Sequence, residues 1–336
     1  MDYRFLGRSG VKVSPICLGT MMFGDHASLE EAGRIVASAR EAGVNFIDTA
    51  DVYCKGESER IVGKLIAQDR ARWVLATKVA NKMGDDPNRQ GTGRKWVMQA
   101  IDESLARLGT DYVDLYYIHK DPGDVPLEET VRAMGDLIAT GKIRYWGVSN
   151  LRGWRIAQAV EACRALGVPQ PVASQPYYNL LNRQPENDIL PACAHYGLGV
   201  VPYSPIARGV LLGKYKPGEA PPEGTRAARK DKRIMETEFR EESLVIAQKL
   251  KAHAEKKGLT AGDFAVGWVL ANPIVTSVIA GPRTFDQWTA YLGALGKRLD
   301  AEDEALVDSF VRPGHPSTPG YNDPAYPLTG RPVARP

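Results

Sequence analysis

Residues 44–59 read VNFIDTADVYCKGESE and pass from a short apolar run to acids, a tyrosine and a charged segment with a glycine. The run VNFI has the length and the β-branched and aromatic content of a buried strand. Asp48 follows it directly, and Tyr53 comes shortly afterwards. An acid at a strand end can simply cap the next helix or take part in chemistry, so the surrounding pattern has to decide its role.

The alternation of a short apolar run with a longer amphipathic segment repeats along the chain. After an opening hairpin from YRFL and VKVS, we expect strands at PICLGT, VNFI, WVLATK, YVDLYYI, KIRYWGVS, VASQ, GVVPYS and SVIAG. Ser28 and Glu31 have the spacing of a capping box, and Gly43 suits the end of the first helix. Later helices are expected near residues 57–68, 94–108, 127–140, 152–165, 187–195, 241–256 and 284–295.

Eight strands, each followed by a helix, predict an α/β fold. The strands are too apolar to face water on one side, which favours a parallel sheet closed into a (β/α)8 TIM barrel with an N-terminal β-hairpin and long loops at its C-terminal face. An open doubly wound sheet is the alternative, but the chain has no G-x-G-x-x-G to support a Rossmann dinucleotide site. We expect residues 1–311 to form one barrel and the Pro-rich residues 312–336 to pack on it as a tail.

Composition limits the classes of partner. The 336 residues are 43% hydrophobic and 25% charged, and no apolar run approaches the length of a membrane span. The 43 basic and 40 acidic residues give a net charge of +3 and are mixed throughout, so neither nucleic acid nor a membrane surface is an expected partner. Cys17, Cys54, Cys163 and Cys193 are far apart and the start lacks an apolar signal region, which indicates free thiols and a cytoplasmic location.

Four ionisable residues fall near the ends of neighbouring strands, where a barrel brings side chains to one mouth. Asp48 ends the second strand, Lys78 the third and His119 the fourth, and Tyr53 lies on the loop after the second. Taken singly, Asp48 can be a helix cap and Lys78 a rim cation. His119 can be a hydrogen-bonded core histidine and Tyr53 a loop aromatic. Together they predict that Asp48 offsets the charge of a desolvated Lys78, and that this cation favours the phenolate of Tyr53, which makes Tyr53 a proton donor near neutral pH.

These residues stand in an ordered series of motifs that resembles the aldo-keto reductase family. The motifs are GVNFIDTADVY with GESE, LATK, LYYIHK, GKIRYWGVSN, SQPYYNLLNR, VVPYSPIARGVLLGKY and VIAGPRTFDQW, over about residues 3–300. The pattern is most similar to the bacterial branch related to the potassium-channel β-subunits. The resemblance implies that Asp48, Tyr53, Lys78 and His119 are the catalytic tetrad of an enzyme that reversibly reduces an aldehyde or ketone, with Tyr53 as the acid and His119 orienting the carbonyl.

Carbonyl reduction requires a hydride, which protein side chains do not supply, so an organic cofactor is needed. The resemblance implies NADP(H). Asn150 offers a partner for a carboxamide or simply caps the next helix, and Tyr203 offers a ring for stacking. By resemblance, the cofactor contacts are Gly19, Thr20, Asp48, Ser149, Asn150, Gln175, Tyr203, Ser204, Pro205, Ile206, Ala207, Gly209, Leu211, Lys214, Arg226, Gly281, Arg283 and Gln287.

The segment AGPRTFDQ after the eighth strand is the expected phosphate site. Thr284 and Gln287 have the spacing of a capping box, which marks a helix N-terminus, and Arg283 stands beside it. A guanidinium next to a helix dipole suits a 2′-phosphate, which favours NADP(H) over NAD(H). Tyr291 departs from the family, which usually has Asn there to hold adenine, and stacking by Tyr291 is the alternative contact.

Long segments are expected around the mouth. The connection between residues 209 and 239 is much longer than usual in α/β units, and Arg226, Arg229 and Lys230 in it either cross the cofactor pyrophosphate or form a solvated charge run. The loop 81–93 is expected to complete the substrate pocket.

The tail has apolar anchors at Tyr321, Tyr326 and Leu328, so we expect it to form part of the mouth or of a subunit contact in a homo-oligomer. Two other functions stay open: a Schiff-base aldolase that uses Lys78, and a cofactor-bound redox-sensing or binding module. No metal site is expected, because no residues have metal-ligand spacing. The expected partner is a small carbonyl or alcohol.

Overall fold

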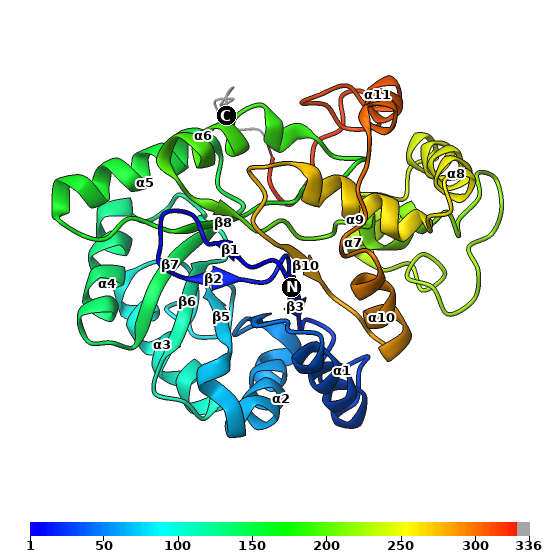
Figure 1. Ribbon diagram of the computed structural model, residues 1–336. Coiled ribbons are helices and arrows are strands. Elements are labelled where there is room, and N and C mark those ends of the chain that lie inside the picture. Colours follow the sequence, from blue (N-terminus) through cyan, green and yellow to red (C-terminus); the bar gives the residue numbers. More distant parts are fainter. Residues whose placement is uncertain (328–336) are drawn as a thin grey trace.

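A computed structural model describes residues 1–327 and places the eight predicted strands in one parallel sheet (Figure 1). The strands follow the order β10-β3-β4-β5-β6-β7-β8-β9. The two ends meet, because the amide of Thr276 donates to the carbonyl of Val200 at 2.8 Å and that of Ile279 to Pro202 at 3.0 Å. The predicted (β/α)8 barrel is therefore confirmed. Its strands are β3 (Ile16–Gly19), β4 (Phe46–Asp48), β5 (Val74–Val79), β6 (Val113–Ile118), β7 (Ile143–Ser149), β8 (Ala173–Gln175), β9 (Gly199–Val200) and β10 (Val278–Ala280).

The predicted N-terminal hairpin, β1 (Arg4–Phe5) with β2 (Lys12–Val13), closes the end of the barrel where the strands begin. In Figure 1 it crosses the strands in dark blue. Leu6 and Val13 are buried against apolar side chains from inside the barrel, including Phe46 and Leu115. Gly7, at φ +59, lies so close to the chain before β8 and β9 that a Cβ would stand 2.5 Å from the carbonyl oxygen of Gly197. The opposite end of the barrel is the end left for a site.

Helices surround the sheet near the predicted ranges, with three that the sequence did not predict. The middle of α9, residues 263–269, is buried all round, so its sequence lacks the polar face that marks an amphipathic helix. The predicted helices are α1 (Leu29–Glu41), α2 (Glu57–Ile66), α3 (Arg94–Leu108), α4 (Leu127–Ala139), α5 (Gly153–Leu166), α6 (Ile189–Tyr196), α8 (Glu241–Lys256) and α10 (Phe285–Gly293), and the others are α7 (Lys232–Glu236), α9 (Ala261–Ala271) and α11 (Ala301–Phe310).

The two proposed capping boxes are each half right. The hydroxyl of Ser28 accepts from the amide of Glu31 at 3.2 Å, as expected at the start of α1. The Glu31 carboxylate, however, accepts from the amide of Phe285 at 2.5 Å instead of returning to Ser28. Likewise Thr284 accepts from the amide of Gln287 at 3.3 Å, whereas the Gln287 side chain accepts from the amide of Arg283 at 2.9 Å. Two N–H groups at the start of α10 are therefore already bonded within the protein.

The described part of the tail, residues 312–327, lies against the barrel. Its backbone bonds to the chain after β8, where the Ser317 amide donates to Leu181 at 2.9 Å. Tyr321 lies under the Arg240 guanidinium, 3.6 Å from the ring centroid. Leu328, proposed as a third anchor, lies outside the described residues. No helix within residues 1–327 combines the length and apolarity needed to cross a membrane.

Candidate active site

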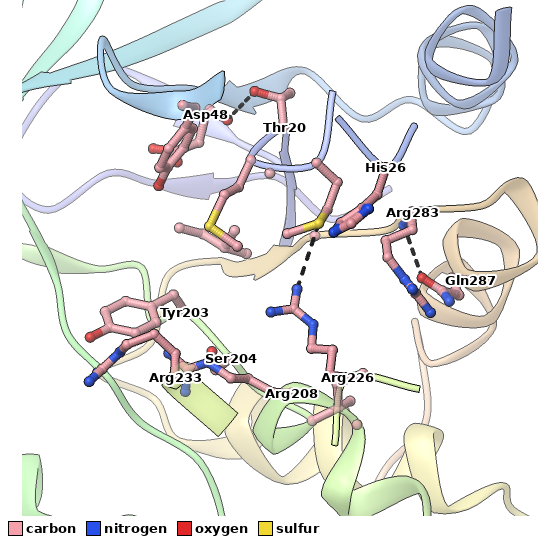
Figure 2. A pocket seen from close by; sticks show the side chains of 18 of the residues that line it. Thr20, His26, Asp48, Tyr203, Ser204, Arg208, Arg226, Arg233, Arg283 and Gln287 are labelled. Atoms are coloured by element: carbon pink, nitrogen blue, oxygen red, sulfur yellow. Dashed lines mark hydrogen bonds between the residues drawn. The ribbon is translucent and has the colours of Figure 1, made fainter. Parts of the chain in front are cut away.

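A cavity of about 870 Å³ opens at the carboxyl ends of the strands, where the barrel architecture predicts a site (Figure 2). Strand ends, the long segment after β9, the start of α10 and Tyr326 of the tail all contribute to its wall. The expected cofactor residues on this wall are Gly19, Thr20, Asp48, Ser149, Asn150, Gln175, Tyr203, Ser204, Ile206, Gly209, Lys214, Arg226, Gly281, Arg283 and Gln287.

Three of the proposed contacts do not line this cavity. Pro205, Ala207 and Leu211 are buried, and Ala207 and Leu211 belong to the main apolar core. For Ala207 and Leu211 the cause is the 3-10 helix η4 (Ala207–Leu212), which turns these two side chains inward and brings Arg208 and Leu212 to the cavity instead. The loop 81–93 also lies off the cavity wall, because Arg89 fastens it to Glu103 on α3 at 2.7–2.8 Å.

The predicted catalytic carboxylate, lysine and tyrosine meet at the base of the cavity, where Asp48 and Tyr53 line the wall and Lys78 lies buried beneath it. Lys78 is fully buried, and its ammonium donates to the Asp48 carboxylate, to the carbonyl of Thr49 at 2.7 Å and to the Tyr53 hydroxyl at 3.1 Å. Gln175 donates to the other Asp48 oxygen at 3.0 Å. Every proton of the ammonium thus has an acceptor, and both Asp48 oxygens have a donor.

The pKa values of this group reflect burial opposed by charge. Burial disfavours the Lys78 cation, but the neighbouring Asp48 overcomes it and raises the pKa of Lys78 to about 12. Burial raises the pKa of Tyr53, and the Lys78 charge works in the lowering direction without reversing the shift. The predicted effect of Lys78 on Tyr53 therefore has the expected sign, whereas the expected net lowering of the Tyr53 pKa is wrong. Tyr53 is held in its protonated form.

His119 faces the same point from the end of β6. Its ring lies edge-on to Tyr53, with centroids 5.9 Å apart. Burial, and then the nearby Lys78 charge, lower the pKa of His119 well below its usual value, so the imidazole is neutral. The Asn81 amide nitrogen lies 2.9 Å from Nδ1, and an amide N–H can only donate, so Nδ1 accepts and Nε2 carries the proton. Asn81 was missed by the sequence reasoning, although it closely follows β5.

Strands β7, β8 and β9 supply a second, linked set of side chains. Asn150, at φ +60, donates to the carbonyl of His119 at 3.0 Å and accepts from the Tyr203 hydroxyl at 2.8 Å. It therefore joins two strand ends instead of capping a helix. Tyr203 stacks on Tyr177 at 5.6 Å, which leaves one side of its ring for the cavity. Ser149 donates to the carbonyl of Gln175 at 2.8 Å, which fixes the strand end that holds Asp48.

Strained backbone concentrates around the cavity. Cys54, Lys55, Asn150, Ser204 and Arg208 have φ values between +49 and +60, a region that residues other than glycine rarely adopt. All five line the cavity. Such strain is retained where the surrounding structure requires it, commonly at functional sites.

The far end of the cavity is cationic. Lys214, Arg226 and Arg283 all line it, and burial followed by the charges of the two arginines lowers the pKa of Lys214. The Arg226 guanidinium contacts Met22 Sδ at 3.7 Å and lies 3.8 Å from Asp231, its nearest carboxylate partner (Figure 2). Because the amides of Phe285 and Gln287 are already bonded, an anion placed here would depend more on these side-chain cations than on the start of α10. Arg229 and Lys230, predicted together with Arg226, are exposed and off the cavity wall, so of these three cations only Arg226 reaches the cavity.

Buried ionic contacts behind the site hold the Tyr53 loop. Glu59, on α2, is fully buried, accepts from Thr77 of β5 at 2.6 Å and pairs with Arg107 at 2.6 Å. This contact fastens α2 beside the strand that carries Lys78. Asp51 is buried nearby, and burial, with the Glu59 charge, raises the pKa of its carboxyl to about 8. The charged end of GESE is therefore internal, not a solvated helix face.

Other cavity residues were missed because their sequence positions are unremarkable. His26 and Met22 come from the loop after β3, and Arg208 and Arg233 from the segment after β9. Figure 2 shows His26 on the side of Thr20, across from Arg208 and Arg233. Within the part of the chain that the structure describes, no three His, Cys, Asp or Glu side chains are placed to hold a metal ion.

Comparison with known proteins gives a consistent result. A model of the Aldo/keto reductase family matches residues 15–312. A probable voltage-gated potassium channel subunit beta of rice, Oryza sativa subsp. japonica, is 36% identical over 300 residues, which cover 88% of this chain and 91% of that protein. The uncharacterized oxidoreductase YrpG of Bacillus subtilis (strain 168) is 36% identical over 336 residues, covering 96% and 99% of the two chains.

Proposed function

The chain belongs to the aldo/keto reductase family, and on that premise we propose that it reduces an aldehyde or ketone to the alcohol with NADPH. The family and the Bacillus relative support an oxidoreductase.

The buried Lys78, bonded at once to Asp48 and Tyr53 beside a neutral His119, is the observation that carries the proposal. Burial of a charged lysine and a charged aspartate costs free energy unless the two are paired. Two apolar side chains of similar volume would make the fold as stable, so stability alone does not explain this pair. A cation placed against a tyrosine hydroxyl stabilises the phenolate that forms when the proton leaves. The arrangement therefore suits proton donation by Tyr53.

The protein residues divide the work around a carbonyl oxygen. His119, with Nε2 protonated, donates a hydrogen bond that orients the carbonyl and polarises it. Tyr53 stays protonated until negative charge develops on that oxygen, and then transfers its proton as Lys78 stabilises the phenolate. A bound nicotinamide supplies the hydride.

The cavity fits a phosphorylated nicotinamide cofactor. Asn150 and Gln175 bring amide groups to the end nearest Asp48, and Tyr203 presents a ring. Lys214, Arg226 and Arg283 supply three cations at the other end, with Asp231 as the carboxylate near Arg226. This surplus of positive charge suits the phosphates, the 2′-phosphate among them, and so favours NADPH over NADH. Tyr291 lines the same end and is available to stack on adenine.

The test is NADPH oxidation, followed by absorbance, against a panel of aldehydes, ketones and keto-sugars. We expect turnover of some members, and a fall of at least about 100-fold in kcat for Tyr53→Phe with unchanged NADPH affinity. Near-normal turnover by Tyr53→Phe would remove Tyr53 from the mechanism. NADPH binding without turnover of any carbonyl would favour a binding module, the role suggested by the names of the potassium-channel relatives. Borohydride trapping of a carbonyl compound on Lys78 would indicate an aldolase instead.

A further inference from the structure

An ion pair joins the long segment after β9 to the C-terminal tail. The Arg233 guanidinium, on α7, donates to both carboxylate oxygens of Asp323, at 3.0 and 2.6 Å. Asp323 is 8% exposed, and a bidentate contact of this kind fixes both distance and orientation. We refer to the pair Arg233–Asp323 as the clasp.

On the tail side, the clasp shapes the turn that carries Tyr326. The Asp323 carboxylate also accepts from the amide of Ala325 at 2.9 Å. The backbone carbonyl of Asp323 accepts from the amide of Tyr326 at 3.0 Å. This is the side-chain-to-backbone pattern of an Asx turn. Arg152, just before α5, donates to the Tyr326 carbonyl at 3.1 Å. Tyr326 is thereby set into the wall of the cavity that also contains Tyr53 and His119.

On the other side, the clasp leads to the cationic end of the cavity. Asp231 caps α7 by accepting from the amide of Ile234 at 3.1 Å, and it lies 3.8 Å from Arg226. A continuous set of contacts therefore runs from Arg226 through Asp231 and α7 to the clasp, and from there to Tyr326. Asp323 itself does not line the cavity, whereas Arg226 and Tyr326 do.

We propose that Asp323 is a positioning residue, which through the clasp sets Tyr326 as the substrate-side wall and couples its position to occupancy of the cationic end. This inference rests on the proposed function, because it takes NADPH as the ligand of Arg226. The Asp231 amide also donates to the Arg226 carbonyl at 3.1 Å, so a phosphate that fixes Arg226 holds the start of α7, and the clasp passes that order to the tail. By reciprocity, a substrate held against Tyr326 tightens NADPH binding by the same factor.

The decisive variant is Asp323→Asn, which keeps the size of the side chain and an acceptor for the amide of Ala325 but removes the charge that Arg233 binds. Glu236→Gln is the matched control, since Glu236 also bonds Arg233, at 3.2 Å, but lies on α7 and has no hydrogen bond or ion pair to the described part of the tail. We expect Asp323→Asn to raise KM for a bulky aromatic ketone by about fivefold or more, with little change in kcat or in KM for a small aldehyde. Glu236→Gln should leave all these constants near wild type.

A second readout is amide hydrogen exchange of peptides within residues 318–327, with and without NADPH. In the wild type and in Glu236→Gln, we expect NADPH to slow this exchange; in Asp323→Asn, exchange should be faster without NADPH and no longer respond to it. Asp323→Asn and Arg233→Gln should have non-additive effects on KM, because each removes the same contact. Additive effects, or tail exchange in Asp323→Asn equal to wild type in both states, would overturn the proposal.

Failure of the proposed function gives a different result. If the wild type turns over no carbonyl but NADPH slows exchange of the tail through Asp323, the clasp stands and the enzymatic role fails. If NADPH does not bind, the coupling is refuted. The comparison of tail amide exchange between ligand-free Asp323→Asn and ligand-free wild type then decides alone whether the clasp positions Tyr326, and faster exchange in the variant supports it.

Discussion

Replacing Lys78 by methionine removes the central cation of the site while nearly keeping its volume. The Lys78 side chain is fully buried and its ammonium has three acceptors: the Asp48 carboxylate, the Thr49 carbonyl and the Tyr53 hydroxyl. In the wild-type structure Gln175 donates to Asp48 at 3.0 Å, and Asp48 is 1% exposed. After the change, Gln175 is the side-chain donor that Asp48 keeps. The variant therefore tests what an unpaired buried carboxylate costs here.

The expected cost is large because one partner is left behind. Breaking a buried ion pair from one side costs about 3 to 5 kcal/mol because a charge is left unpaired, whereas replacing both partners by well-packed apolar groups of similar volume is often neutral. We therefore expect the free energy of unfolding to fall by about 3 kcal/mol or more at pH 8 in Lys78→Met, and to recover much of this loss in Lys78→Met with Asp48→Asn. Both variants should lose carbonyl reduction.

The loss in the single variant should depend on pH. Burial already raises the pKa of Asp48 above its usual value, and Lys78 is the main influence that lowers it. Without Lys78, the folded state binds a proton more tightly than the unfolded state does. Protonated Asp48 therefore contributes its full stability to the variant below the pKa that this carboxyl has in the unfolded chain. That contribution is lost as the pH rises through the pKa that Asp48 has in the folded chain. The difference between the variant and the wild type should therefore shrink at lower pH.

Urea unfolding of the wild type, both single variants and the double variant at pH 5 and pH 8 measures these differences and the coupling between the two sites. The variant with Asp48→Asn alone closes the cycle. A loss below about 1 kcal/mol in Lys78→Met, typical of an exposed pair, or additive effects in the cycle would refute the inference of a buried, mutually dependent pair.

Three further predictions address the cofactor, the imidazole and the tail. Arg283→Ala should weaken NADPH by about 1.5 to 3 kcal/mol, the contribution of a charged hydrogen bond, and leave NADH binding nearly unchanged; equal weakening of both in a binding titration would make Arg283 structural or a contact of the shared pyrophosphate. Asn81→Leu frees His119 Nδ1 and should lower kcat by about tenfold with a shifted pH profile, and an unaltered profile would mean that Asn81 does not set the tautomer. Ending the chain at Pro313 removes Tyr326 and the clasp but spares every strand, so KM should rise for bulky ketones while turnover of a small aldehyde stays close to wild type; unchanged kinetics on every substrate would show that the tail does not border the substrate.

Local signals in the sequence were enough to place the strands and the four residues at the base of the cavity. Each strand has a short apolar run, and Asp48, Lys78 and His119 stand where such runs end. Topology then brings them together, because parallel strands of one barrel end on one side. The same reasoning could not find α9, whose buried Phe264, Ala265 and Val266 occupy consecutive positions and give no helical stripe.

The remaining differences depend on contacts between residues that are distant in the chain. Glu31 has the right spacing to bond Ser28, yet its carboxylate binds the amide of Phe285, a group that no local pattern could identify. The pKa of Tyr53 is a balance between the depth of burial and the charge of Lys78, and depth is a property of the folded chain. The clasp likewise joins Arg233 to Asp323 across 90 positions of sequence.

The residues proposed for proton chemistry and those proposed for ligand binding come from different arcs of the barrel wall. Asp48, Lys78 and His119 come from β4, β5 and the end of β6, whereas most of the proposed nucleotide contacts come from β7 through β10 and the segments after them. Gln175 is the main bridge between the two arcs, through its bond to Asp48. A change in the loops of the second arc can therefore alter what the cavity binds while Asp48, Lys78 and Tyr53 keep their positions.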